Sequence, residues 1–228
     1  MLNYETLRSL YLEDLETSVT YDGKKARQRV YNIEAWKQLP TVDLKEYTQP
    51  LTLWKDSSDV WCFSDQHFGH NNIINYCNRP FPDTRLMTEC MIGNYQKLVK
   101  PNDICIWVGD VGFMNDLEIN NILSQLNGYK ILVIGNHDFH HQKLRNLNFH
   151  EVYLLYHLRV EDDDLDLVFT HYPMNNLPPG VINIHGHLHD KETGSNQHIN
   201  VSVERTNYKP INLKTLIPIA KQYKAIYD

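Results

Sequence analysis

The sequence lacks a long apolar run and the pattern of a secretory leader. No stretch approaches the roughly 20 consecutive apolar residues that a membrane-spanning helix requires. The N-terminus has no basic region followed by an apolar run. We therefore expect a cytoplasmic protein that has no membrane partner.

Cysteine is scarce, and its spacing shows no paired motif. The chain has 4 cysteines and no C-x-x-C sequence. Cys62 and Cys105 lie inside apolar runs, where cysteine usually acts as a small buried hydrophobic residue. These features indicate a reducing environment, in agreement with a cytoplasmic location.

An excess of basic residues is also missing. Lysine and arginine number 22 against 28 aspartates and glutamates, so the formal net charge is -6. A protein that follows a long stretch of nucleic-acid backbone needs a basic face, so we do not expect long nucleic acid as a partner. A small phosphorylated substrate is compatible with this charge, because bound metal ions would reverse the sign of the field inside a site.

The length of 228 residues allows one well-filled core and a modest extension. We predict an extension at residues 1–50, packed on the core of a domain at residues 51–228. Within the extension we expect a short helix at residues 2–15, a polar loop at 21–29 and a second helix at 32–38. The extension offers no candidate catalytic group. We interpret it as a packing element, with partner docking or covering of the substrate as the alternative.

From about residue 52, short apolar runs alternate with segments of helical spacing. The runs are rich in β-branched residues, as is typical of strands buried on both faces; they lie at residues 60–63, 104–108, 131–134, 165–170, 181–184 and 199–203. Helical spacing is found over residues 72–99 and 116–126, and Gly128 is placed to end the second helix. This order predicts an α/β layered fold with central sheets and covering helices.

Histidine is abundant, with 12 residues, and polar motifs follow five of the predicted strands. The motifs are Asp65-Gln66-His67, Gly109-Asp110, Gly135-Asn136-His137-Asp138, Thr170-His171-Tyr172-Pro173 and His185-Gly186-His187-Leu188-His189. Ligand sites of open α/β sheets lie at the carboxyl ends of strands, so the five motifs are expected to converge on one rim. Aspartate, asparagine and histidine suit Mn, Fe, Zn or Mg better than a soft copper or iron–sulfur site.

The spacing inside the motifs carries two further expectations. Asp65 and His67, like His187 and His189, are separated by one residue, so on extended backbone each pair would project in one direction. Glycines 109, 135 and 186 are expected to let backbone and metal approach closely, because they lack a Cβ.

Taken together, D-x-H, G-D, G-N-H-D, T-H-x-P and G-H-x-H resemble the calcineurin-like metallophosphoesterase superfamily over residues 60–203. Residues 63–70, with 79–81 and 200–204, resemble a small bacterial and phage branch of it. The resemblance implies a four-layer α/β/β/α fold, with a layered β-sandwich core flanked by helices. It also implies two divalent metal ions, Mn²⁺ foremost, with Fe, Zn, Ni and Mg as alternatives.

The resemblance also assigns roles to individual residues. It implies metal ligands at Asp65, His67, Asp110, Asn136, His171, His187 and His189, with Asp110 shared between the two ions. His137 is implied to stabilise the transition state or protonate the leaving oxygen, and Asp138 to hold its ring. His70, Asn71 and Arg79 are candidates for substrate contacts at the rim; for Arg79 a surface salt bridge or a capping role is the alternative.

The function implied is that of an enzyme, a metal-dependent phosphohydrolase. It would cleave a phosphate mono- or diester, such as that of a nucleotide, with a water or hydroxide bridging two metals. Phosphodiesterase or nuclease action on short nucleic acid is an alternative, and so is a non-catalytic partner-binding module on the same fold. The physiological substrate and the oligomeric state do not follow from the sequence.

Overall fold

The computed structural model describes residues 16–21, 24–29, 59–138, 147–160, 163–175 and 177–227. The helices expected at residues 2–15 and 32–38 lie outside these ranges. Strands β1 (Glu16–Tyr21) and β2 (Lys24–Arg29) form an antiparallel hairpin, which belongs to a separate unit of the chain. The loop predicted at residues 21–29 is therefore wrong. Its polarity suggested a loop, but a polar strand is stable when a partner strand satisfies its backbone hydrogen bonds.

A five-stranded sheet forms the first layer of the larger unit. Its order is β11-β3-β4-β5-β6, and its strands are β3 (Val60–Phe63), β4 (Ile104–Trp107), β5 (Tyr129–Val133), β6 (Glu151–Tyr153) and β11 (Ile211–Asn212). Strands β3 to β6 are parallel, whereas β11 runs antiparallel to β3. The carboxyl ends of β3, β4 and β5 therefore meet at the same edge.

A four-stranded sheet forms the second layer, in the order β10-β9-β8-β7. Its strands are β7 (Tyr156–Val160), β8 (Leu165–Thr170), β9 (Val181–His185) and β10 (His198–Asn200). Strands β8, β9 and β10 are parallel, and β7 is antiparallel to β8. The loops that follow β8 and β9 therefore leave this sheet at one edge.

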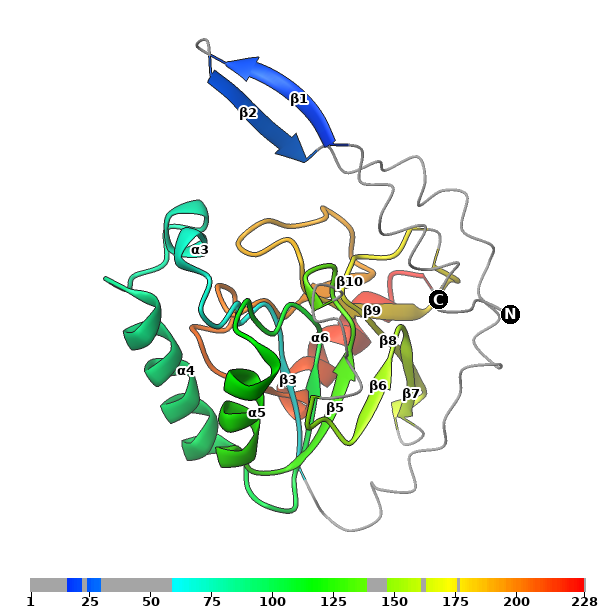
Figure 1. Ribbon diagram of the computed structural model, residues 1–228. Coiled ribbons are helices and arrows are strands. Elements are labelled where there is room, and N and C mark those ends of the chain that lie inside the picture. The colour runs from blue at the N-terminus through cyan, green and yellow to red at the C-terminus, as the bar shows by residue number, and fades with distance from the viewer. Residues whose placement is uncertain are drawn as a thin grey trace. The chain divides into compact units, whose positions relative to one another are not determined.

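Helices α4 (Thr84–Leu98) and α5 (Asp116–Gln125) cover one face of the five-stranded sheet (Figure 1). Helix α5 begins at a capping box, in which Asn115 and Glu118 satisfy each other's backbone N–H groups. Helix α6 (Leu213–Lys224) packs on β3, β8 and β9, and the short helix α3 (Asn71–Tyr76) precedes α4.

Two hydrophobic cores follow from the alternation of side chains along each strand. In β4, Ile104 and Ile106 face the core between the two sheets, whereas Cys105 and Trp107 face the core under α4 and α5. Cys62 and Cys105 are fully buried, as predicted. The first of these cores packs the two sheets against one another. Loops continue the chain from the carboxyl ends of the parallel strands.

The expected α/β architecture, with central sheets flanked by helices, is confirmed. The segment 72–99 holds two helices rather than one, and the sequence analysis did not anticipate β6, β7, β11 or α6. The helix expected at residues 116–126 is confirmed, and Gly128 follows it with φ +83°.

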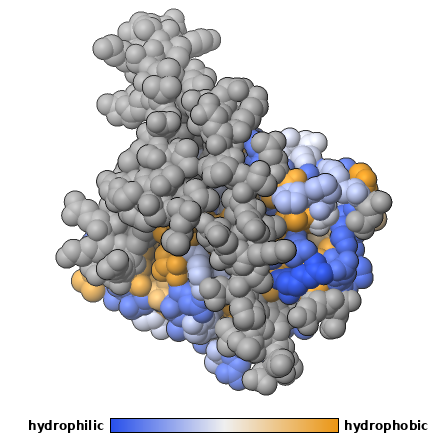
Figure 2. Space-filling model, turned by 90° about the vertical axis from the view of Figure 1, so that its right-hand side faces the viewer, coloured by the Kyte–Doolittle hydropathy of each residue, from blue (hydrophilic) through white to orange (hydrophobic). Residues whose placement is uncertain are grey.

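None of the described helices is long and apolar enough to cross a bilayer. On the coloured part of the face in Figure 2, hydrophilic and hydrophobic side chains lie next to one another.

Candidate metal centre

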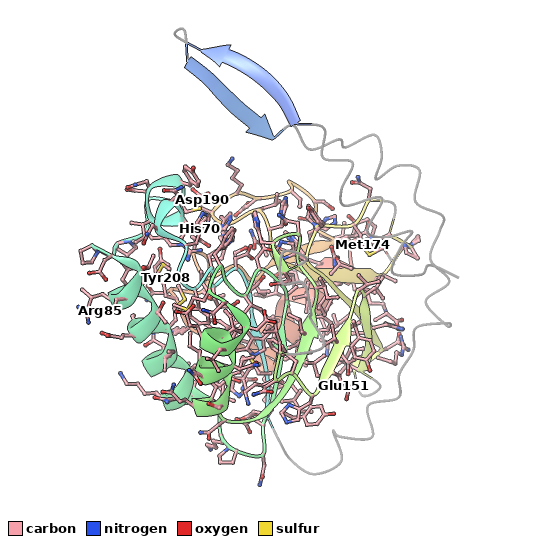
Figure 3. The ribbon with its side chains drawn as sticks, viewed as in Figure 1. His70, Arg85, Glu151, Met174, Asp190 and Tyr208 are labelled. Carbon is pink, nitrogen blue, oxygen red and sulfur yellow. The ribbon has the colours of Figure 1, made fainter. Side chains whose placement is uncertain are left out.

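The polar motifs lie in the loops that follow the strands, and both sheets contribute. Asp65 and His67 follow β3, Asp110 follows β4, Asn136 follows β5, His171 follows β8, and His187 and His189 follow β9. Figure 3 shows His70, from the loop after β3, toward one end of the sheets, and Glu151, at the start of β6, toward the other. The expected convergence of the motifs at the carboxyl edge is therefore observed.

Two groups that consist of sequence-predicted ligands come close enough to hold a metal ion each. One consists of Asp65, His67 and His189, and the other of Asp110, His171 and His187. In each group the ligand atoms lie within 4.8 Å of one another. Each group draws residues from both sheets, so neither sheet alone forms a site.

Asn136 belongs with the second group. Its Oδ1 lies 3.1 Å from Nε2 of His171 and 3.1 Å from Nδ1 of His187. The amide oxygen therefore adds a fourth ligand atom to the carboxylate and the two imidazoles. The sequence-predicted ligands thus separate into Asp65, His67 and His189 on one side and Asp110, Asn136, His171 and His187 on the other.

Asp110 stands between the two groups. Its Oδ2 lies 3.5 Å from Nε2 of His67, in the first group, and 3.2 Å from Nε2 of His171, in the second. Its Oδ1 accepts the backbone N–H of His137 at 2.8 Å. One carboxylate oxygen is thus held by the loop, and the other faces imidazoles of both groups.

The backbone of Asp65, His67, His187 and His189 departs from the extended form expected for these two pairs. Positive φ angles occur at Asp65 (60°), His67 (53°), Asp110 (56°), His187 (68°) and His189 (53°). Only a few per cent of non-glycine residues adopt this left-handed region. The prediction of extended backbone is therefore wrong, because tight turns follow the strands directly. Such strain persists where the surrounding structure holds it, and it concentrates at functional sites.

Hydrogen bonds from the loops hold both carboxylates in place. Ser64 donates its hydroxyl to Asp65 at 2.6 Å, and the backbone N–H of His187 lies 3.0 and 3.1 Å from the two oxygens of Asp65. The carbonyl of Val108 lies 2.7 Å from Nδ1 of His171. That bond fixes the imidazole so that Nε2 faces Asp110, as is common for metal-binding histidines.

All three glycines permit the close approach that the sequence analysis expected. A Cβ at residue 109 would lie 2.6 Å from Nδ1 of His171. A Cβ at residue 186 would lie 2.0 Å from Oγ of Ser64 and 2.3 Å from Oδ2 of Asp65. A Cβ at residue 135 would lie 2.4 Å from Oδ1 of Asp110. Any side chain at residue 186 or 135 would displace a carboxylate of the centre.

The electrostatics of the centre favour a bound cation. Burial lowers the pKa of His67 and of His187 well below the usual value, so both imidazoles are neutral and keep a lone pair. Burial opposes charge on Asp110, yet the neighbouring imidazoles, His171 first, hold its pKa well below the usual range. Within the described residues, Nε2 of His67 is buried and has no hydrogen-bond partner. Buried carboxylates beside imidazoles are a donor set that fits a divalent cation.

Asp138 is fully buried behind this centre. Its carboxylate accepts the backbone N–H groups of Asp110 (2.9 Å), Val111 (2.9 Å) and Gly135 (2.7 Å). Burial, and then the charge of Asp110, raises the pKa of Asp138 to about 6. These bonds join the loops after β4 and β5, which gives Asp138 a positioning role. Its predicted hold on the ring of His137 stays a prediction.

His137 itself lies at the opening of the centre. Its Nε2 is 3.9 Å from Oδ2 of Asp110, and its side chain is 14% exposed. Its ring centroid lies 5.4 Å from that of His67. The imidazole is therefore close to the ligands of both groups and reachable from solvent, as a proton donor to a leaving group must be.

The three residues expected at the rim have different surroundings. Nδ1 of His70 lies 3.3 Å from Nδ1 of His67, next to the centre. Asn71 is exposed and accepts a hydrogen bond from Thr84, which joins α3 to the start of α4. Arg79 is 4% exposed, so the expected rim contact does not fit its position. Its guanidinium donates hydrogen bonds to the carboxylate of Glu204 and to the backbone carbonyls of Asp65 and Gln66.

The sequence analysis missed three residues that contribute to the centre. Oε1 of Glu204 lies 3.0 Å from Nδ1 of His189 and accepts a hydrogen bond from Nε of Arg79 at 2.8 Å, so Glu204 orients a ligand. Phe113 is 43% exposed and its ring stacks on His70 at 4.0 Å. Cys77 lies near His189 and Glu204. Glu204 lies 15 residues after His189, in the stretch 200–204 that contributed to the resemblance, but no role was assigned to it. Phe113 and Cys77 lie in none of the motifs.

Comparisons with known proteins give relatives without a stated activity. The chain matches no model of a known protein family. A crystal structure of AQ665 from Aquifex aeolicus, described as a protein of unknown function, aligns with a TM-score of 0.58 and 27% identity, over 71% of this chain and 99% of that one. The uncharacterized protein MJ1445 of Methanocaldococcus jannaschii is 31% identical over 176 residues, which are 73% of this chain and 94% of the relative. The chain therefore belongs to the family of MJ1445.

Proposed function

We propose that this protein is a metal-dependent phosphohydrolase of the calcineurin-like metallophosphoesterase type, with the four-layer fold that this resemblance implies. Two divalent cations, Mn²⁺ foremost, would be held by the two groups of ligands described above. The observation that carries the proposal is the position of Asp110, whose Oδ2 faces Nε2 of His67 at 3.5 Å and Nε2 of His171 at 3.2 Å. A carboxylate in that position can serve both ions of a two-metal centre.

The ions, when bound, would supply Lewis-acid stabilisation of a phosphoryl group and a water of lowered pKa. The chain's own residues would do the rest. Neutral His67 and His187 offer lone pairs without first losing a proton. Backbone N–H groups hold Asp65 and Asp110 so that little reorganisation is needed when charge develops.

His137 is the residue proposed to handle the proton of the leaving group. It is positioned by its own loop, because its backbone N–H donates to Asp110 at 2.8 Å. Its imidazole lies beside both ligand groups and remains partly exposed. A phosphate ester entering from solvent would therefore meet His137 at the centre.

The substrate class proposed is a small phosphate mono- or diester. The net charge of -6 disfavours binding of long nucleic acid. The exposed ring of Phe113, stacked on His70, offers a flat apolar surface beside the centre, on which an aromatic group of a substrate such as a nucleobase can stack.

A hydrolysis screen with added Mn²⁺ tests the proposal. The substrates are p-nitrophenyl phosphate, bis(p-nitrophenyl) phosphate, 5′-nucleoside monophosphates, and 2′,3′- and 3′,5′-cyclic nucleotides. We expect Mn²⁺-dependent release of product from at least one class, abolished in Asp110→Asn. Asp163→Asn is the matched control, because that carboxylate pairs with Lys221 on α6.

Two results would contradict the proposal. Protein that binds Mn²⁺ but hydrolyses none of these esters would favour the non-catalytic binding module. Activity that Asp110→Asn leaves unchanged would place the chemistry at another site. Hydrolysis of p-nitrophenyl phosphate would indicate monoesterase action, and hydrolysis of bis(p-nitrophenyl) phosphate would indicate diesterase action.

A further inference from the structure

A cysteine lies beside the first ligand group. Cys77 directly follows α3, and its backbone N–H donates to the carbonyl of Ile73 at 3.0 Å. Its Sγ, an imidazole nitrogen of His189 and a carboxylate oxygen of Glu204 all lie within 4.8 Å of one another. The three side chains come from the end of α3, the loop after β9 and the segment after β10. The fold therefore brings a thiol, an imidazole and a carboxylate together from distant parts of the sequence.

Glu204 has an oxygen available for a ligand. Its Oε1 accepts a hydrogen bond from Nε of Arg79 and lies 3.0 Å from Nδ1 of His189. Its Oε2 is buried and, among the residues that the structure describes, has no hydrogen-bond partner. The Glu204 side chain is only 5% exposed. A buried carboxylate oxygen without a partner costs free energy that a bound cation would recover.

We propose that Cys77, His189 and Glu204 form an additional metal site that takes a thiophilic divalent cation such as Zn²⁺. Thiolate, imidazole and carboxylate are the usual ligands of zinc, which accepts three protein ligands and a water. Mn²⁺ and Mg²⁺ prefer oxygen ligands, so the thiol sets this site apart from the two groups at the centre. On binding, the thiol loses its proton to solvent and the thiolate becomes the ligand.

His189 is shared between this site and the Asp65–His67 group. A neutral imidazole offers one lone pair, so it serves one ion at a time. Zn²⁺ held by Cys77 and Glu204 would withdraw His189 from Asp65 and His67. The additional site would thus compete with occupancy of the first group. The site itself does not depend on the proposed function, whereas the competition rests on metal binding at the first group.

Co²⁺ is the probe that distinguishes this site, because thiolate ligation gives a charge-transfer band in the near ultraviolet and oxygen or imidazole ligation does not. Reduced, metal-free protein is titrated with Co²⁺ in the wild type, Cys77→Ser and Cys90→Ser. Cys90 is exposed and therefore serves as the control thiol. We expect the band in the wild type and Cys90→Ser, and its loss in Cys77→Ser with an unchanged circular dichroism spectrum.

A wild type without the band, or a band that persists in Cys77→Ser, would overturn the proposal. Excess Mn²⁺ should weaken the band, because Mn²⁺ at the first group takes His189. A band that Mn²⁺ leaves unchanged would overturn the shared use of His189. The titration is repeated in Asp110→Asn, where the band should persist even if the two-metal centre is lost, so the two proposals fail separately.

Discussion

Replacement of Arg79 by methionine should destabilise the protein without removing any proposed ligand. The arginine side chain is fully buried, and Glu204, its ion-pair partner at 2.7 Å, is 5% exposed. It also donates to the carbonyls of Gln66 at 2.9 Å and Asp65 at 2.7 Å. Methionine keeps much of the apolar stem but supplies no donor, so Glu204 loses its arginine partner and two carbonyls lose a donor.

The magnitude follows from these contacts. Loss of one partner of a buried ion pair costs about 3–5 kcal/mol, and a buried carbonyl without a partner costs about 1–3 kcal/mol. These terms share one guanidinium and are not additive, and His189 still lies 3.0 Å from Glu204. We therefore expect a loss of about 3–5 kcal/mol in the free energy of unfolding. For a domain of this size that corresponds to a fall of roughly 6–20 °C in Tm.

Urea unfolding of metal-free protein at neutral pH measures this loss. Glu204→Gln combined with Arg79→Met should recover part of it, because the uncompensated charge is then gone. Arg85→Met is the matched control; Arg85 pairs with Glu89 on the surface of α4 and is 68% exposed, so no resolvable change is expected. A loss below about 1 kcal/mol in Arg79→Met would refute the reasoning, since a buried pair costs several times more when broken.

The remaining predictions concern the centre itself. His137→Ala should keep its metal content and lose about 10²–10⁴-fold in turnover, with a smaller loss for p-nitrophenyl than for alkyl esters; an equal loss for both would indicate charge stabilisation instead. Gly186→Ala should weaken Mn²⁺ binding measured by equilibrium dialysis, because its Cβ would lie 2.3 Å from Oδ2 of Asp65; unchanged binding would mean that Asp65 is not a ligand. Asp110 raises the pKa of buried His171 to about 9 although burial opposes it, so the metal-free imidazole is protonated below that pH. Mn²⁺ binding should therefore release protons and tighten as pH rises toward about 9, and calorimetry showing pH-independent affinity would contradict this.

The sequence predicted most strands of the two large sheets, and it predicted that the candidate metal centre lies at their carboxyl ends. The reason is physical. Runs such as residues 104–108 are apolar on both faces because β3, β4 and β5 each separate two cores. The motif after each run marks where the chain leaves the sheet. The hairpin at residues 16–29 and helix α6 were missed, because their patterns become clear only with a partner strand or a packing surface.

The ligand groups were predictable as residue types but not as geometry. The left-handed turns at Asp65 and His187 leave no mark in a D-x-H or H-x-H spacing. Glu204 orients His189 from 15 residues away, and Arg79 was expected at the surface although its guanidinium lies buried against Glu204. Such contacts depend on how the loops after β3 and β9 meet, which spacing along one chain does not encode.

Metal content tests the central claim most directly. The protein is saturated with Mn²⁺, freed of unbound metal by gel filtration and measured by elemental analysis, in parallel with Asp110→Ala and the control Asp163→Ala. The arrangement of Asp110 between the two ligand groups predicts close to two ions per chain in the wild type and the control, and loss of both in Asp110→Ala. A wild type that binds no ion, or full occupancy in Asp110→Ala, would contradict the account.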